Sequence, residues 1–144
     1  MKILKTMRRR LQRGNAILEL GFATPMMMLM LSGVIDFGRA FYFSDAAVSA
    51  ARAGAQYGIE SPSNMTNYTG MQQAAVNDAQ GIPSFTAVAD SYCLDSSGNA
   101  ALCTAVGARG YVRVKTTVVY NLMIPWPGLP NPINIGGQSV LRCQ

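Results

Sequence analysis

The chain has 144 residues, the length of one domain, with 12 basic and 7 acidic residues, 3 cysteines and no histidine. Of these residues 49% are hydrophobic and only 13% are charged, against roughly 25% charged in typical soluble domains, which points to a membrane segment. A chain without histidine excludes Ser-His-Asp and Cys-His catalysis and imidazole metal ligands. We therefore expect a protein that is not an enzyme and that needs no cofactor.

The basic excess lies at the N-terminus. Residues 1–14 contain six basic residues and no acidic one, whereas the remaining chain contains six basic residues and all seven acids. No aromatic residue lies among the leader charges to stack on a base, so we expect no nucleic-acid partner. Because Lys and Arg resist translocation, the leader predicts a cytoplasmic N-terminus.

An apolar run follows the leader. Residues 15–35 carry one charge, and as a helix with a rise of 1.5 Å per residue they would be about 31 Å long, the thickness of a bilayer core. We predict a membrane-spanning helix over 15–35, with the chain from Asp36 onward outside. A cleaved secretory signal peptide and an uncleaved single-span anchor are the alternatives, although the run is longer than a signal peptide's apolar region and lacks a small-x-small cleavage site at the expected distance.

The single charge in this run is Glu19. A carboxylate in hydrocarbon costs several kcal/mol unless it is paired or close to the interface. A position in the first turn of a helix would stabilise it by roughly 0.3–1 kcal/mol. If the chain were cut after Gly14, the new ammonium group of Asn15 would supply a counter-charge for Glu19 of a neighbouring copy.

Three short runs in this order resemble a known family: residues 8–20 (RRRLQRGNAILEL), 33–39 (GVIDFGR) and 50–55 (AARAGA). Together they are similar to the TadE-like minor pilins, which are pseudopilins of tight-adherence, type IV-like pilus systems. The resemblance implies cleavage between Gly14 and Asn15 by a prepilin peptidase, with Glu19 needed for assembly. It also implies a bacterial inner-membrane location and, as partners, other pilin subunits, the inner-membrane assembly machinery and membrane lipid, but no small-molecule substrate.

Pro25 interrupts the apolar run. It removes one backbone donor, so the carbonyl of Gly21 loses its helical partner and a kink or a locally unwound turn is predicted. The hydroxyl of Thr24 is one group that would reduce the cost in lipid. Type IV pilins, which the chain resembles, also carry a helix-breaking residue in this segment.

Residues 36–58 are alanine-rich and contain no proline, so the helix is expected to continue outside the membrane. Ala47, Ala51 and Ala55 fall on one face, where they would pack either against another subunit or against the protein's own sheet. Four aromatic residues at the start of this stretch are interpreted as an interfacial belt: Phe37, Phe41, Tyr42 and Phe43.

The remaining residues, 59–144, predict a small exterior domain. A helix is expected over 71–80, capped by Gly81, with Ala74, Ala75 and Val76 turned inward. Strands are expected over 86–90, 111–122 and 138–142. A proline-rich loop, residues 125–132, separates the second of these strands from the third. In the second strand one face is expected to be buried: Val112, Val114, Thr116, Val118, Tyr120 and Leu122.

These elements indicate an α+β fold in which a small antiparallel sheet packs on the exterior half of the long helix. The expected domain boundaries are a leader at 1–14, a transmembrane helix at 15–35, an exterior helix at 36–58 and an exterior domain at 59–144.

The cysteines favour a disulfide between Cys93 and Cys103, which flank a nine-residue loop, although three cysteines also allow a pair between Cys103 and Cys143. We expect no structural zinc, because a fourth ligand is missing. The run from Asp90 to Asn99 is interpreted as a hairpin turn and not a calcium loop, since it lacks alternating acids. Trp126 is either an anchor at a partner interface or a cap on the sheet edge.

The sequence therefore predicts a minor pilin that is processed after Gly14 and takes part in pilus assembly and adherence. The alternative is a single-pass envelope binding module that keeps its leader and has an exterior α+β domain.

Overall fold

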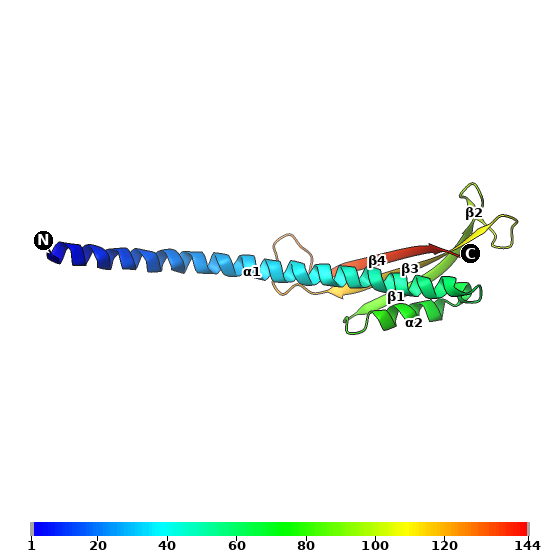
Figure 1. Cartoon of the computed structure of the whole chain (residues 1–144), viewed down its shortest axis with the longest axis horizontal. Helices are drawn as coiled ribbons and strands as arrows, with labels where there is room; N and C mark the ends of the chain where they lie inside the picture. The colour runs from blue at the N-terminus through cyan, green and yellow to red at the C-terminus, as the bar shows by residue number, and fades with distance from the viewer. Residues whose placement is uncertain (1, 144) are drawn as a thin grey trace. The chain divides into compact units, whose positions relative to one another are not determined.

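The structure is a computed structural model that describes the backbone of residues 2–143 and the side chains of residues 16–143. Helix α1 (Lys2–Glu60) is followed by a short 3-10 helix η1 (Asn64–Thr66), helix α2 (Tyr68–Asp78) and strands β1 (Phe85–Leu94), β2 (Ala100–Ala101), β3 (Arg109–Tyr120) and β4 (Ile133–Arg142) (Figure 1). This order confirms the α+β class with a long N-terminal helix and a small antiparallel sheet. The chain forms two compact units, of which one ends at Gly38 and the other begins at Arg39.

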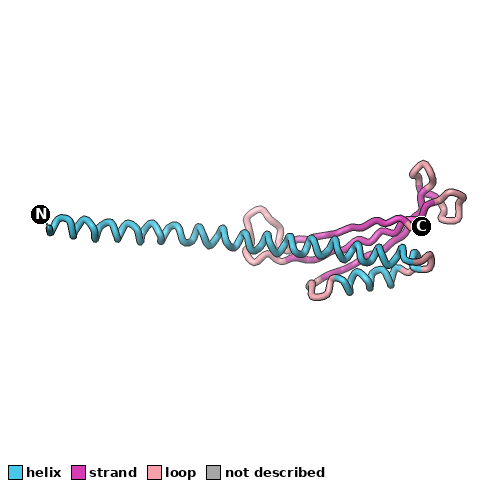
Figure 2. The backbone as a smooth tube through the Cα atoms, in the orientation of Figure 1, coloured by secondary structure: helices cyan, strands magenta, loops and turns pink. Residues whose placement is uncertain are grey.

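The sheet has the strand order β2-β1-β3-β4, and each neighbouring pair is antiparallel. Figure 2 shows the long strands in magenta beside the C-terminal part of α1. The central strand β3 pairs Val114 with Ala89 of β1 and with Ser139 of β4. Alternate residues of β3 are buried, as the sequence predicts: Val112, Val114, Thr116, Val118 and Tyr120. Leu122 lies beyond the end of the strand.

Helix α2 and the part of α1 after Arg39 pack on one face of this sheet. Ala47, Ala51 and Ala55 are fully buried, and the core joins Ala55 to residues of α2, β1 and β3. A Cβ added at Gly54 would lie 2.7 Å from the backbone oxygen of Met71, so a glycine is needed for this approach. The small-residue stripe therefore covers the protein's own sheet, which decides between the two alternatives for these alanines.

Helix α2 differs from the expected helix at both ends. It begins at Tyr68 because the Asn67 side chain accepts a hydrogen bond from the Gly70 N–H, at 3.0 Å, and so caps the first turn. It ends at Asp78 with Ala79, not Gly81, as its C-cap. The buried residues are Met71, Ala75 and Ala79, so the inward position expected for Val76 is wrong: its side chain is 43% exposed.

Strand β4 starts five residues earlier than expected, at Ile133. Its first half contains Gly136 and Gly137, which have low strand propensity and hide the strand in the sequence. The structure explains Gly137, since a Cβ there would lie 2.7 Å from the backbone of Ala47 in α1. The glycine thus lets the helix backbone lie directly on the strand.

Candidate membrane and assembly segment

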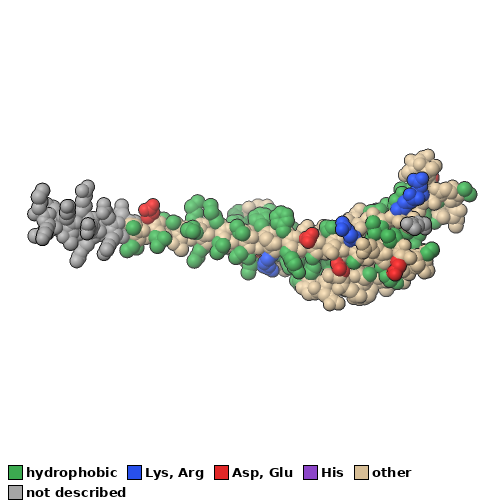
Figure 3. Space-filling view, viewed as in Figure 1, with side chains coloured by type: hydrophobic (Ala, Val, Ile, Leu, Met, Phe, Trp, Pro, Cys, Tyr) green, Lys and Arg blue, Asp and Glu red, His purple; other side chains and the backbone are tan. Residues whose placement is uncertain are grey.

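Apolar side chains dominate α1 between residues 16 and 35, and they are exposed. Phe22, for example, is 80% exposed. Figure 3 shows hydrophobic side chains along this part of the helix. The other large apolar residues here are also exposed: Ile17, Leu18, Leu20, Met26, Met27, Met28, Leu29, Met30, Leu31, Val34 and Ile35. Such a surface is unfavourable in water and matches a lipid environment.

The described chain contains one helix, Ala16–Glu60, with a stretch long and apolar enough to cross a membrane, and none of that stretch is buried. This fits an N-terminal membrane anchor, because about 20 apolar residues are needed to span a bilayer. The side of the membrane on which each end lies stays a prediction.

Glu19 lies exposed in this segment, between Leu18 and Leu20. The backbone of Gly14 and Asn15 belongs to α1, but the side chains of residues 1–15 lie outside the described residues. Cleavage between Gly14 and Asn15 and the neutralisation of Glu19 by the new amine therefore stay predictions.

Pro25 lies inside α1, and the residues on both sides of it are helical. The locally unwound turn is therefore not present, while a bend at Pro25 stays a prediction. The Thr24 hydroxyl donates a hydrogen bond to the carbonyl of Leu20, at 2.7 Å, and not to the carbonyl of Gly21. This i to i−4 bond is the usual one for a threonine inside a helix.

The aromatic residues after the apolar segment divide into two sets. Phe37, Phe41 and Tyr42 are exposed, as an interfacial belt requires. Phe43 instead packs on Tyr120 of β3, with ring centroids 5.5 Å apart, and the guanidinium of Arg39 lies 5.5 Å from the centroid of the same Tyr120 ring. The expectation for Phe43 is corrected: its ring is attached to the sheet.

The segment that carries these features is also the one that matches a known family. Residues 14–56 match the family described as TadE-like protein. The match begins at Gly14 and contains the apolar segment, Glu19 and the alanine stripe. It is the family that the sequence resembles. No curated protein and no solved structure matches the chain.

Outside the TadE-like segment, the disulfide between Cys93 and Cys103 is present, as predicted. It connects β1 to the turn after β2, and Cys143 is left as a free thiol. Burial raises the pKa of the Cys143 thiol, so this cysteine is held in the less reactive protonated form.

Asp95 forms the turn inside the disulfide loop. Its carboxylate accepts hydrogen bonds from the backbone N–H groups of Ser97, at 2.8 Å, and Asn99, at 2.9 Å. These bonds hold the pKa of Asp95 below its ordinary value, and the bond from the Asn99 N–H has the largest effect. The carboxylate thus organises a turn, in agreement with the hairpin interpretation, and among the described residues no group of three acidic, cysteine or histidine side chains is placed to bind a metal.

Trp126 lies half-buried in the proline-rich loop, where its carbonyl accepts a hydrogen bond from the Leu129 N–H at 3.2 Å. This contact organises a turn in the loop. The role of the indole as a partner anchor stays a prediction.

The sequence did not reveal a polar cluster on the outer face of the sheet. The Arg113 guanidinium makes a two-point ion pair with Asp90, with Nε donating to Oδ1 at 2.9 Å, and lies 5.5 Å from the ring centroid of Tyr92. Tyr92 in turn stacks on Tyr111, with ring centroids 5.5 Å apart. The hydrogen bond from Arg113 is the main cause of a lowered pKa of Asp90. These residues become neighbours through the register of β1 against β3. The alternation of residues along a single strand does not show this register, so the sequence alone could not reveal the cluster.

Proposed function

We propose that the chain is a minor pilin of a tight-adherence pilus: a structural, non-catalytic subunit that is anchored in the bacterial inner membrane before assembly. The observation that carries this proposal is the TadE-like match, which begins at Gly14, the residue expected just before the cleavage site. The exposed apolar segment after it, with Glu19 as its one acidic side chain before Asp36, supports the same function.

The proposed processing divides the chain by function. A prepilin peptidase removes residues 1–14, residues 15–35 hold the subunit in the membrane, and the exterior domain remains outside the cytoplasm. In the assembled pilus the new ammonium group of Asn15 neutralises Glu19 of a neighbouring subunit, because a carboxylate surrounded by apolar helices needs a counter-charge. The partners are then the peptidase, other pilin subunits and the inner-membrane assembly machinery.

The decisive measurement is the intact mass of the protein extracted from membranes of its natural host. We expect a chain that starts at Asn15, and a Gly14→Val variant that keeps its leader because the small residue before the cut is lost. A wild-type chain that retains residues 1–14 in working pili would reject the proposal and favour the single-pass envelope binding module.

Glu19 is tested by substitution. We expect Glu19→Ala to be cleaved but to be missing from sheared pili, whereas Asp45→Ala, which removes another exposed acid of the same helix, is incorporated normally. Equal incorporation of the two variants would remove the role assigned to Glu19.

A further inference from the structure

Strand β4 is an edge of the sheet with free backbone groups. In the sheet order it lies beside β3 alone. The Cys143 N–H donates to the Gly110 carbonyl at 2.9 Å, and because bonded residues alternate along an antiparallel pair, the odd-numbered residues of β4 bond to β3. The even-numbered residues 134–142 therefore direct their N–H and C=O groups away from the sheet. All of them are exposed, and for Gly136 this means that the backbone itself is exposed.

This edge lacks the usual protection against pairing. β4 has 10 residues, and it contains no proline, no lysine and no acid. Natural edge strands are commonly kept short or carry lysine, proline or a bulge, because free strand edges pair with other chains. On the opposite side of the sheet, β2 covers only Cys93 and Leu94 of β1, and the rest of that edge contains an acid, Asp90, which β4 lacks.

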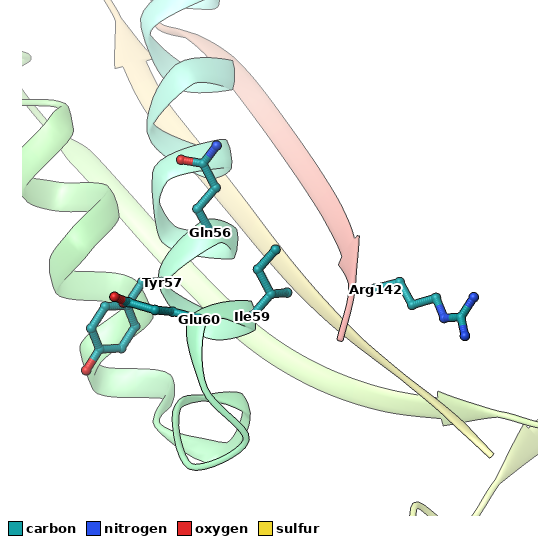
Figure 4. A pocket seen from close by; sticks show the side chains of 5 residues that line it. All are labelled: Gln56, Tyr57, Ile59, Glu60 and Arg142. Carbon is teal, nitrogen blue, oxygen red and sulfur yellow. The ribbon is translucent and has the colours of Figure 1, made fainter. Parts of the chain in front are cut away.

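An open cavity lies against the end of the same edge. Its volume is about 670 Å³, and it is lined by the last turns of α1 and by Arg142 of β4 (Figure 4). The side chains from α1 are Gln56, Tyr57, Ile59 and Glu60. In Figure 4 Ile59 extends from the helix into the space beside β4. A strand edge next to a helix with an apolar residue between them is the arrangement in which extended peptides bind by strand addition.

The charges beside the edge favour an acidic partner. Arg142 is exposed at the end of β4, and Lys115 is exposed one strand further in, on the same outer face. The nearby carboxylate of Asp90 is already paired with Arg113, and that of Glu60, which also lines the cavity, extends from α1 away from β4 (Figure 4). Arg142 and Lys115 are therefore left as positive charges on this face.

We propose that β4 and the adjacent cavity bind an extended segment of a partner protein as a fifth, antiparallel strand, with an acidic side chain opposite Arg142 and an apolar side chain in the cavity beside Ile59. The backbone bonds supply affinity without sequence preference, while the charge and the cavity select the segment. This binding goes beyond the proposed pilin function and does not depend on cleavage of the leader.

A second copy of the chain fits this edge less well. The backbone of α1 at Ala47 lies directly on Gly137 of β4. If two β4 strands paired, they would lie about 4.8 Å apart, whereas packed helices need about 8–10 Å between their axes. A segment without a helix on that face avoids this conflict.

The test uses the full chain in lipid nanodiscs and a fluorescent eight-residue peptide that begins Glu-Leu-Val, so that in antiparallel register these residues lie opposite Arg142, Leu141 and Val140. Binding is measured by fluorescence anisotropy, with empty nanodiscs as the blank. We expect saturable binding that becomes at least tenfold weaker when the peptide is N-methylated at its third and fifth residues, which lie opposite Val140 and Gln138. Replacing the peptide's Glu by Lys is expected to weaken binding several-fold for the wild type and to strengthen it for Arg142→Glu.

A matched pair of variants tests the edge itself. Gln138→Pro removes one free N–H group without removing a bond to β3, and it is expected to weaken peptide binding at least tenfold, whereas Gln138→Thr keeps the N–H and the affinity. If Gln138→Pro does not fold, hydrogen exchange of the wild type decides, because the peptide must slow exchange of the even-numbered amides in 136–142. Equal binding of the N-methylated peptide, or no protection of these amides, overturns the proposal. Self-association of the chain that requires the Gln138 N–H, without peptide binding, also overturns it and makes a second copy the occupant.

Discussion

Thr116 is a polar side chain in the buried row of β3, and it connects the sheet to the helix. Its hydroxyl donates to the carbonyl of Ala47 in α1, at 2.7 Å, while its side chain is almost fully buried. We expect Thr116→Val to lower the free energy of unfolding of the unit that begins at Arg39 by about 1 kcal/mol, the usual net value of one hydrogen bond. Chemical denaturation in detergent measures this change.

The control for this prediction is the next residue. Thr117 is exposed on the opposite face of β3, so Thr117→Val removes a hydroxyl of the same kind without removing a bond to α1. It should leave the free energy of unfolding within about 0.5 kcal/mol of the wild type. Equal effects of the two substitutions would mean that the bond to Ala47 contributes nothing.

The ion pair of Asp90 and Arg113 makes a prediction about pH. Because Arg113 lowers the pKa of Asp90 below the ordinary value of about 3.9, the pair stabilises the folded state above that pH. This contribution is lost as the pH falls through the lowered pKa. We expect Arg113→Gln to raise the pKa of Asp90 toward its ordinary value, as measured by NMR titration of the carboxyl carbon. Both side chains are partly exposed, so high salt should reduce the difference between wild type and variant.

A contradictory result would be an Asp90 pKa that is the same in the wild type and in Arg113→Gln. Lys115→Gln is the matched control, because Lys115 also lowers the pKa of Asp90 but only through its charge and as the last of the contributing causes. Its substitution should therefore change this pKa less than that of Arg113.

At the scale of elements, close packing of α1 on α2 depends on Gly54. Alanine would favour the helix by up to about 1 kcal/mol, but its Cβ would lie 2.7 Å from the backbone oxygen of Met71, which cannot rotate away. Overpacking of this kind costs about 1–3 kcal/mol, so we expect Gly54→Ala to destabilise the unit that begins at Arg39 by about 1–2 kcal/mol net. Thermal unfolding followed by circular dichroism measures this.

Gly38→Ala provides the comparison. No atom lies within 4 Å of a Cβ added at Gly38, so this substitution has the gain in helix propensity without the clash. It is expected to leave the melting temperature unchanged or slightly higher. If Gly54→Ala and Gly38→Ala had the same melting temperature, the two helices would adjust to the added methyl group without cost.

The elements differ in how well the sequence predicted them. Alternation along β3 predicted its buried residues from Val112 to Tyr120, because a strand with one covered face must repeat every second residue, but it also included Leu122, which lies beyond the strand and is half-buried. The start of β4 was missed, since Gly136 and Gly137 read as loop residues until Ala47 is seen lying on Gly137. The inward face of α2 was partly misplaced, because its buried residues repeat every four positions from Met71 and not as a consecutive run.

At the scale of the whole molecule, the exposed apolar segment predicts that the chain is retained in membranes. Arginine near the centre of a spanning helix opposes insertion by about 2.5–3.5 kcal/mol per residue. We expect the double substitution Met27→Arg and Leu31→Arg to shift the protein out of the carbonate-resistant membrane fraction. The apolar exchange Met27→Leu and Leu31→Met should leave it there, and full retention of the double arginine variant would contradict a spanning role for this segment.

The sequence by itself determined the features that depend on composition and on spacing along one element: the apolar segment with Glu19, the small-residue stripe, the alternation of β3 and the resemblance to the TadE-like family. These are local signals, because hydrophobic length and periodicity need no partner to be recognised. Tertiary structure decided which surfaces meet. It placed the alanine stripe on the protein's own sheet, joined Asp90 to Arg113 across two strands and left β4 as an open edge beside a cavity. Such contacts connect residues far apart in the chain, and their register follows from the packing of side chains from several elements at once.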